Sequence, residues 1–158
     1  MDDADILLSD VGSHKLTIAR RFPTYEPNTC LISNGLASMG IAVPGAVAAD
    51  LAVDRSVVAA TGDGGFLMNA AELETATRLD CDFTVIVFVD DDYGLISAKQ
   101  VDHRGEAFGT ELTNPDFVAF AESFGIEAYR PADWAGLEEL LDAHIGSEGL
   151  SLIEVPLA

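Results

Sequence analysis

Two acidic segments contain side chains that could bind a metal cation. In the first, TGDGG, Asp63 is flanked by glycines, and in the second, DDDYG, three consecutive carboxylates start at Asp90. Mg²⁺ prefers oxygen ligands and is often shared with phosphate oxygens. Each segment alone is also compatible with a turn that binds no ligand, or with a solvated acidic surface. A metal site therefore requires a fold that brings Asp63 and Asp90 together.

The glycines next to these carboxylates could accommodate an anion. Gly62, Gly64 and Gly65 permit a tight turn, expose backbone N–H groups and let a bound group approach closely. Gly94 follows the second acidic run, where we expect a turn of helix to begin. The N–H groups at such a helix end can face a diphosphate.

Short apolar runs alternate with helical patterns along the chain. The expected strands are Asp5–Ser9, Thr29–Ser33, Ser56–Thr61, Phe83–Val89, Ile126–Tyr129 and Leu150–Val155. The expected helices are His14–Arg20, Leu36–Leu51, Ala70–Leu79, Pro115–Phe124 and Asp133–Ile145. This alternation predicts a single α/β domain over residues 1–158, with a doubly wound, mainly parallel sheet of about six strands and helices on both faces.

The third and fourth expected strands place the two acidic segments at one edge of the sheet. Ser56–Thr61 and Phe83–Val89 are continuously apolar, which is typical of central strands covered on both faces. Open parallel sheets bind ligands beyond the carboxyl ends of their strands. If these strands are neighbours, Asp63 and Asp90 lie side by side, and the sequence predicts a metal and anion site there.

Two further segments carry weaker signals. Asn69 and Glu72 have the spacing of a capping box, which predicts that the helix Ala70–Leu79 starts there. The polar segment Gln100–Thr113 fits neither a helix nor a strand template, so we expect a functional loop or an ordered excursion.

Composition narrows the class of protein. The chain has 27 acidic and 8 basic residues, a formal charge of −19, and a 49% hydrophobic share that excludes intrinsic disorder. A surface this acidic repels nucleic acid and anionic lipid headgroups. The acidic excess predicts adaptation to high salt, with an ordinary acidic protein as the alternative. We expect a soluble cytoplasmic protein for three reasons. Cys30 and Cys81 are isolated cysteines, the N-terminus has no basic signal-peptide region, and the sequence has no long apolar run.

The region between the two acidic segments resembles a known cofactor signature. Asp63 and Asp90 are 27 positions apart, and GDGGFLMNAAELETATRLDCDFTVIVFVDDDYGLI resembles the thiamin diphosphate motif of a GDG followed by an Asn-rich strand end. This chain departs from the motif in having Asp90 where many relatives have Asn. DVGSHK, YEPNTCLISNGLASMGIAVPGA and GLSLIEVP extend the resemblance over nearly the whole chain. Together they are similar to the C-terminal, diphosphate-binding domain of acetolactate synthases, most of all to the catabolic, flavin-independent type.

This resemblance implies a set of site residues. Mg²⁺ would be bound by Asp63, Asp90 and the backbone carbonyl of Asp92. Met39 would lie under the cofactor and fold it into a V shape, and the backbone carbonyl of Ala37 would accept a hydrogen bond from its aminopyrimidine; these two are the implied catalytic positions. The implied cofactor site as a whole consists of Val11, Gly12, Ser13, His14, Ala37, Met39, Gly62, Asp63, Gly64, Gly65, Asp90, Asp92, Tyr93, Gly94 and Leu95.

The resemblance also implies an activity and a partner. The family decarboxylates pyruvate and joins the product to a second 2-oxo acid, a carboligation that needs thiamin diphosphate and Mg²⁺ and, in the catabolic type, no FAD. In the family, the activating Glu lies on a separate pyrimidine-binding domain, and we expect that domain and the central domain to be absent from this chain. We therefore expect a homo-oligomer of dimeric or higher order that is inactive without a pyrimidine-binding domain or subunit.

Two alternatives compete with this interpretation. One is the small subunit of a split 2-oxo acid decarboxylase, similar to sulfopyruvate decarboxylase. The other is a non-catalytic module that binds a phosphate ligand on the same kind of sheet. The chain contains no GxxxxGKS or GxGxxG motif, which weakens the second alternative.

Overall fold

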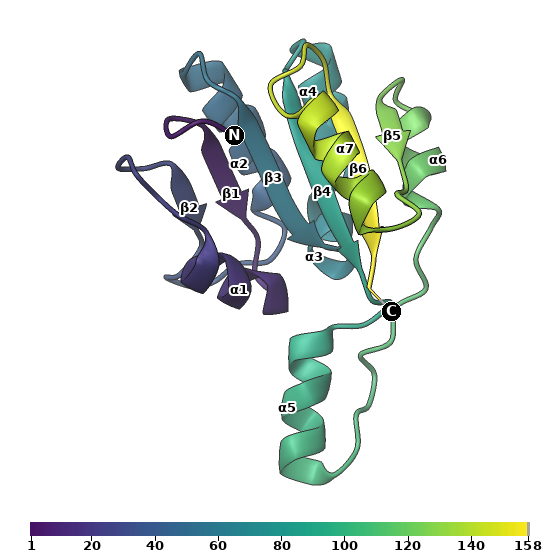
Figure 1. Cartoon of the computed structure of the whole chain (residues 1–158). Coiled ribbons are helices and arrows are strands. Elements are labelled where there is room, and N and C mark those ends of the chain that lie inside the picture. The colour runs from purple at the N-terminus through teal and green to yellow at the C-terminus, as the bar shows by residue number, and fades with distance from the viewer. Residues whose placement is uncertain (158) are drawn as a thin grey trace.

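The computed structural model describes residues 1–157, whose strands form a parallel sheet in the order β2-β1-β3-β4-β6-β5 (Figure 1). The strands are β1 (Ile6–Ser9), β2 (Cys30–Ile32), β3 (Val57–Gly62), β4 (Phe83–Val89), β5 (Glu127–Tyr129) and β6 (Ser151–Pro156). The helices are α1 (Ser13–Arg21), α2 (Ala42–Ala52), α3 (Asp63–Asn69), α4 (Glu72–Arg78), α5 (Gly94–Arg104), α6 (Phe117–Glu122) and α7 (Trp134–His144). The predicted α/β fold class is confirmed.

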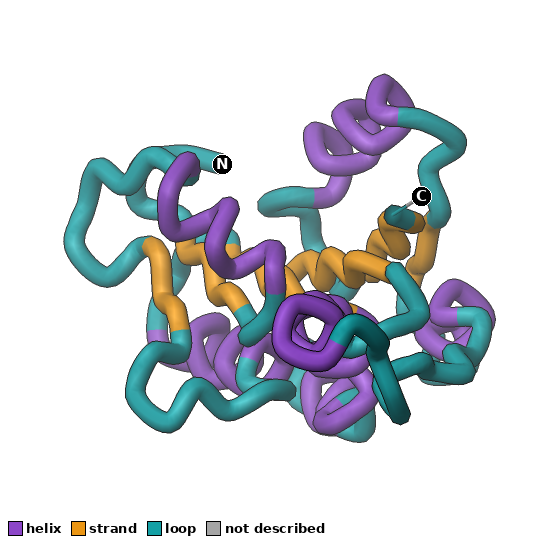
Figure 2. Tube along the Cα trace, turned by 90° about the horizontal axis from the view of Figure 1, so that it is seen from below, coloured by secondary structure: helices purple, strands orange, loops and turns teal. Residues whose placement is uncertain are grey.

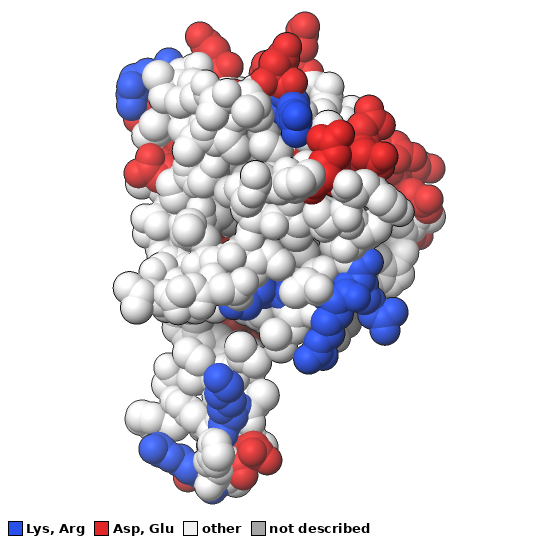
Figure 3. Space-filling model, turned by 90° about the vertical axis from the view of Figure 1, so that its left-hand side faces the viewer, with Lys and Arg blue, Asp and Glu red and all other residues white. Residues whose placement is uncertain are grey.

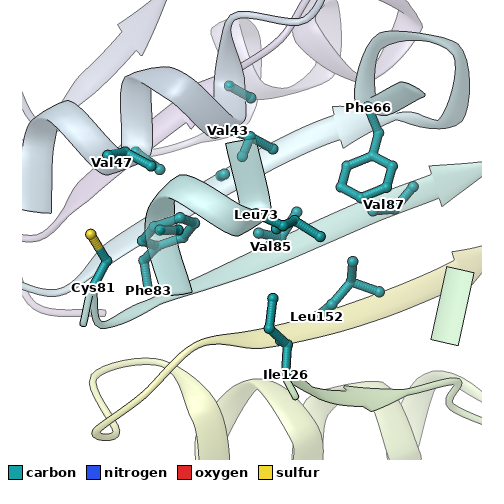
Figure 4. Packing of buried hydrophobic residues seen from close by; sticks show 14 of the residues in the cluster. Val43, Val47, Phe66, Leu73, Cys81, Phe83, Val85, Val87, Ile126 and Leu152 are labelled. Atoms are coloured by element: carbon teal, nitrogen blue, oxygen red, sulfur yellow. The ribbon is translucent and has the colours of Figure 1, made fainter. Parts of the chain in front are cut away.

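Helices cover both faces of the sheet (Figure 2). The larger core cluster packs under α2, α3, α4 and α6, with Phe66 and Leu73 among its large buried side chains (Figure 4). The smaller cluster lies on the other face, next to α1 and the end of α7. Successive residues of β3 enter opposite clusters, Val57 the larger and Val58 the smaller. This two-sided burial explains why the strand is continuously apolar.

The chain reverses its direction across the sheet next to β1. From β1 it passes to β2 on one side, and it then crosses through α2 to β3 on the other side of β1. The crossovers on the two sides leave a crevice at the carboxyl ends of β1 and β3, which is where open α/β sheets bind ligands. Gly62 of β3 is paired with Phe88 of β4, so the residues that follow both strands leave the sheet next to each other.

Helix α5 projects away from the sheet at this same edge (Figure 1). None of its residues is buried, and Gly105, with φ of 83°, ends it in the left-handed conformation. Of the two expectations for Gln100–Thr113, a functional loop or an ordered excursion, the loop is therefore wrong for the first five residues, which are helical. A helix that stands clear of the core needs no apolar face, so its polar sequence lacks the periodic pattern of a packed helix.

Three other local expectations are corrected. Helix α2 begins at Ala42 and not at Leu36, because residues 36–41 form a loop with Ala37 and Gly40 at positive φ. The GDGG run joins the last residue of β3, Gly62, directly to the first three residues of helix α3, and it is not a turn. Asn69 ends α3 and donates from Nδ2 to the Gly40 carbonyl at 2.8 Å, and Ala71 precedes α4 without a side-chain cap, so the capping box is wrong.

Acidic side chains are concentrated at the end of the molecule opposite α5, where the strands begin, and some basic side chains lie there too (Figure 3). Basic side chains also lie nearer to α5, and the tip of α5 carries side chains of both signs. Within residues 1–157, no helix is both long and apolar enough to span a membrane.

Candidate functional site

A cavity of about 530 Å³ opens at the carboxyl edge of the sheet, between α1, the loop before α2 and the start of α5. It is lined by Val11, Gly12, Ser13, His14, Thr17, Ile18, Ala37, Met39, Gly62, Asp63, Gly64, Gly65, Phe88, Asp90, Asp92, Tyr93, Gly94, Leu95, Ile96, Lys99 and Leu157. Every residue of the cofactor set inferred from the sequence is in this lining. The residues of this set are up to 84 positions apart in the sequence, from Val11 to Leu95, and they meet in one place.

Asp63 is the most tightly held carboxylate at the cavity. It is 2% exposed, and its Oδ1 accepts a hydrogen bond from the Gly64 backbone N–H at 2.8 Å. Its Oδ2 accepts one from the Asp91 N–H at 2.8 Å and one from Asn114 Nδ2 at 2.7 Å. Three donors therefore compensate the burial of the charge and fix the orientation of both oxygens.

Asp90 is the second carboxylate at the predicted metal position. Partial burial raises the pKa of Asp90, and the nearby negative charge of Asp63 raises this pKa further. A cation placed between the two carboxylates would relieve this repulsion. Gly94 keeps the space open, because a Cβ at that position would lie 2.8 Å from Asp90 Oδ2.

Carboxylate side chains alone cannot complete the coordination of a metal ion at this site. Within the described residues, no group of three or more His, Cys, Asp or Glu side chains is arranged to hold a metal ion. The proposed set of Asp63, Asp90 and the Asp92 backbone carbonyl uses only two such side chains. It is therefore compatible with Mg²⁺ only if phosphate or water oxygens complete the coordination, which is the usual arrangement for this ion.

His14 faces the cavity from the first turn of α1. Its ring stacks on Phe88 with centroids 5.5 Å apart, and its Nε2 is buried without a hydrogen-bond partner in the described part of the chain. Burial lowers the pKa of His14, and the opposing effect of Asp10 is smaller. Gly12 is required here, because a Cβ on it would lie 2.7 Å from the imidazole ring.

The structure fits a large anionic group in two respects. His14 Nε2 is a buried polar atom that has no hydrogen-bond partner within residues 1–157. Helix α5 begins at Gly94 with no side-chain cap and no acidic residue in its first turn, so the N–H groups of its first two residues, Gly94 and Leu95, are available to an anion.

Asp10, the first residue of the DVGSHK segment, is a buried residue at this edge for which the sequence predicts no separate role. It follows β1 and accepts hydrogen bonds from the Val11 N–H at 2.6 Å and from the Gly40 N–H, at 2.9 Å to Oδ2. Thr61 Oγ1 donates to Asp10 Oδ2 at 3.2 Å. Asp10 thereby ties the loop that carries Ala37 and Met39 to the ends of β1 and β3. Its place after a strand was the only signal, and the sequence does not show what it binds.

A second missed feature is a return segment, residues 110–114, that follows α5 and pairs with the β4–α5 loop. The Tyr93 N–H donates to the Thr110 carbonyl at 2.9 Å, and the Leu112 N–H donates to the Asp91 carbonyl at 2.7 Å. Asp92 and Glu111 form an antiparallel bridge. The loop with the predicted metal ligands is therefore held from outside by chain that comes about twenty residues later.

Comparison with known proteins agrees with this geometry. Residues 10–155 match the family model described as "Thiamine pyrophosphate enzyme, C-terminal TPP binding domain". The chain is 37% identical to acetolactate synthase of Bacillus subtilis (strain 168) over 158 residues, which is 99% of this chain and 28% of that protein. It is 34% identical to the catabolic acetolactate synthase of Raoultella terrigena, in a match that covers 98% of this chain and 28% of that protein. It is also 34% identical to a probable acetolactate synthase large subunit of Methanocaldococcus jannaschii, in a match that covers 95% of this chain and 26% of that protein. The chain thus spans little more than a quarter of the length of these relatives.

Proposed function

Because the chain belongs to the family of thiamine pyrophosphate enzymes, as their C-terminal TPP-binding domain, we propose that its cavity binds thiamin diphosphate together with Mg²⁺. The observation that carries this proposal is the meeting of Asp63 and Asp90 at neighbouring strand ends, beside a helix N-terminus that no side chain caps. Anionic oxygens on one side and backbone N–H groups on the other suit a metal-bound diphosphate.

Each element of the site has a separate task in this proposal. Asp63, Asp90 and the Asp92 carbonyl hold Mg²⁺, while the N-terminus of α5 and His14 contact the diphosphate. The orphaned Nε2 of His14 gains a partner when phosphate oxygens enter the cavity. A neutral His14, favoured by its lowered pKa, donates one hydrogen bond without adding charge.

The loop before α2 positions the rest of the cofactor. Met39 and Ala37 line the cavity, and Asp10 anchors their loop through the Gly40 N–H. Ala37 has φ of 51°, a left-handed conformation that is unfavourable for alanine and that is found at functional sites. We assign its carbonyl to the aminopyrimidine and the Met39 side chain to the support of the folded cofactor. Bound thiamin diphosphate supplies the electron sink for decarboxylation of a 2-oxo acid.

The proposed activity of the complete enzyme is formation of acetolactate from pyruvate. Relatives bearing the name acetolactate synthase match nearly all of this chain, although the chain matches only 28% or less of their length. We propose that a pyrimidine-binding domain supplies the activating Glu and covers the open side of the cavity. Exposed apolar side chains beside the cavity support a partner there: Leu36 is 98% exposed, and Ile96 of α5 is 45% exposed.

Calorimetric titration tests the proposed cofactor site. Asp63→Ala should abolish Mg²⁺-dependent thiamin diphosphate binding, because the best-ordered metal ligand is lost. Asp90→Asn should retain binding, because an amide still offers a carbonyl oxygen. The matched control Asp102→Ala removes a carboxylate from the exposed part of α5 and should bind as the unchanged chain does. Undiminished binding by Asp63→Ala, in protein with the circular dichroism of the unchanged chain, would refute the site.

A further inference from the structure

Asn114 lies at the end of the return segment and connects two carboxylates of the cofactor edge. Its Nδ2 donates to Asp63 Oδ2 at 2.7 Å and to Asp91 Oδ1 at 2.7 Å. Asp63 and Asp91 are already joined by the hydrogen bond from the Asp91 N–H to Asp63 Oδ2. Asn114 therefore completes a triangle of hydrogen bonds at the start of α3 and the start of the β4–α5 loop.

The chemistry of the primary amide suits this position. An amide nitrogen carries two donors, so one side chain can satisfy both carboxylates and hold them close together. Unlike Lys or Arg, it brings no positive charge that would compete with a cation for the same carboxylates. Because Nδ2 binds Oδ2 from one side, Asp63 cannot rotate away from the cavity without breaking this bond and the bond from the Asp91 N–H.

The backbone around Asn114 makes the arrangement rigid. The Leu112 N–H donates to the Asp91 carbonyl at 2.7 Å, two residues before Asn114. Asp91 has φ of 56°, an uncommon conformation for a non-glycine residue that requires support from its surroundings. The Asp91 N–H and side chain are both engaged within this triangle, so Asn114 supports a strained loop as well as Asp63.

We propose that Asn114 is a positioning residue for the metal: it holds Asp63 in its metal-binding orientation and joins the return segment after α5 to the metal site. The assignment rests on the proposed function, because it takes Asp63 as a Mg²⁺ ligand. Partners that orient metal ligands from behind typically change metal affinity by about 10–100-fold when they are removed.

Titration with Mn²⁺, a spectroscopic probe for the Mg²⁺ site, tests this assignment in the full chain. Free Mn²⁺ is measured by electron paramagnetic resonance at saturating thiamin diphosphate, for the unchanged chain and for Asn114→Leu and Asn114→Ala. Both variants should raise the dissociation constant of Mn²⁺ at least about tenfold. At saturating Mn²⁺, the dissociation constant of each variant for thiamin diphosphate should stay within about threefold of that of the unchanged chain. A general loosening of the fold would instead weaken the binding of thiamin diphosphate as well.

The matched control is Gln100→Leu, which also replaces an amide by an apolar side chain and lies in helix α5. Gln100 Oε1 accepts a hydrogen bond from the Phe108 N–H at 2.7 Å, away from Asp63, so this variant should bind Mn²⁺ as the unchanged chain does. Unchanged Mn²⁺ affinity in both Asn114 variants, or an equal loss in Gln100→Leu, overturns the assignment and leaves the proposed function standing. If the unchanged chain binds neither Mn²⁺ nor thiamin diphosphate, the proposed function fails and the assignment fails with it. Should Asn114→Leu not fold, Asn114→Ala decides alone.

Discussion

At the scale of single residues, the cofactor edge depends on buried polar groups that are satisfied from distant parts of the chain. Most residues that line the cavity were named from the sequence, through the family resemblance and through their places after strands. It did not predict Asp10 and Asn114 as site residues. Both act through hydrogen bonds to segments that are 30 or more positions away, Asp10 to Gly40 and Asn114 to Asp63. Such partners are determined by tertiary packing and leave no local pattern.

His14 should make stability depend on pH. Burial lowers the pKa of His14 in the folded state below the ordinary value of 6.5, so the unfolded chain binds this proton more readily. The neutral ring makes its full contribution to the stability of the fold above pH 6.5. This contribution is lost as the pH falls from 6.5 through the pKa of His14 in the folded state. Denaturant unfolding between pH 8 and 5 should therefore show a smaller loss of stability in His14→Gln than in the unchanged chain. Parallel curves would contradict this role of burial.

At the scale of elements, strands were easier to predict than helices. The two central strands are continuously apolar, and Phe83–Val89 has the predicted bounds. Helix α3 was missed, and helix α5 was predicted only as a turn of helix at Gly94, for different reasons. Helix α3 begins directly at the end of β3 with the sequence DGG, whose glycines disfavour a helix unless packing requires it. Helix α5 lies outside the core, so no apolar periodicity marks it.

The loop before α2 should contain stored strain. Ala37 at φ of 51° is in a conformation that glycine adopts without a steric penalty. Ala37→Gly should therefore raise the free energy of unfolding by about 0.5–1 kcal/mol, since relief of strain exceeds the added entropy of the unfolded chain. The matched change Ala48→Gly, on the exposed side of α2, should lower it by about 1 kcal/mol. Urea unfolding of both variants measures the difference, and a loss in Ala37→Gly as large as that in Ala48→Gly would show that no strain is stored.

At the scale of the whole molecule, most acidic charge is unpaired. Ion pairs within residues 1–157 involve only Arg55, Arg78 and Arg130, against 27 acidic residues in the chain. The amino ends of the strands are especially acidic, with Asp50, Asp54, Asp82 and Glu148 close together around one depression. Repulsion among these groups is long-ranged in dilute buffer and is screened within about 3 Å at molar salt.

Stability should therefore rise with salt concentration. We expect the melting temperature to increase as KCl is raised from dilute buffer to 2 M, because screening removes net repulsion. A variant with Asp54→Asn and Glu148→Gln should melt higher than the unchanged chain in dilute buffer and should gain less from KCl. A flat or falling melting temperature, or an equal gain in the variant, would show that surface repulsion does not limit stability.

The central claim is that this domain binds thiamin diphosphate with Mg²⁺ and is not a general phosphate-binding module. Thermal unfolding of the unchanged chain with thiamin diphosphate and Mg²⁺, compared with ATP and NAD at the same concentration and Mg²⁺, tests it most directly. At ligand about 100-fold above its dissociation constant, binding adds about 2.7 kcal/mol, which for a domain of this size raises the melting temperature by about 5–10 °C. We predict this rise for thiamin diphosphate, its loss when EDTA removes Mg²⁺, and no rise with ATP or NAD. No rise with thiamin diphosphate, or an equal rise with ATP or NAD, would contradict the claim.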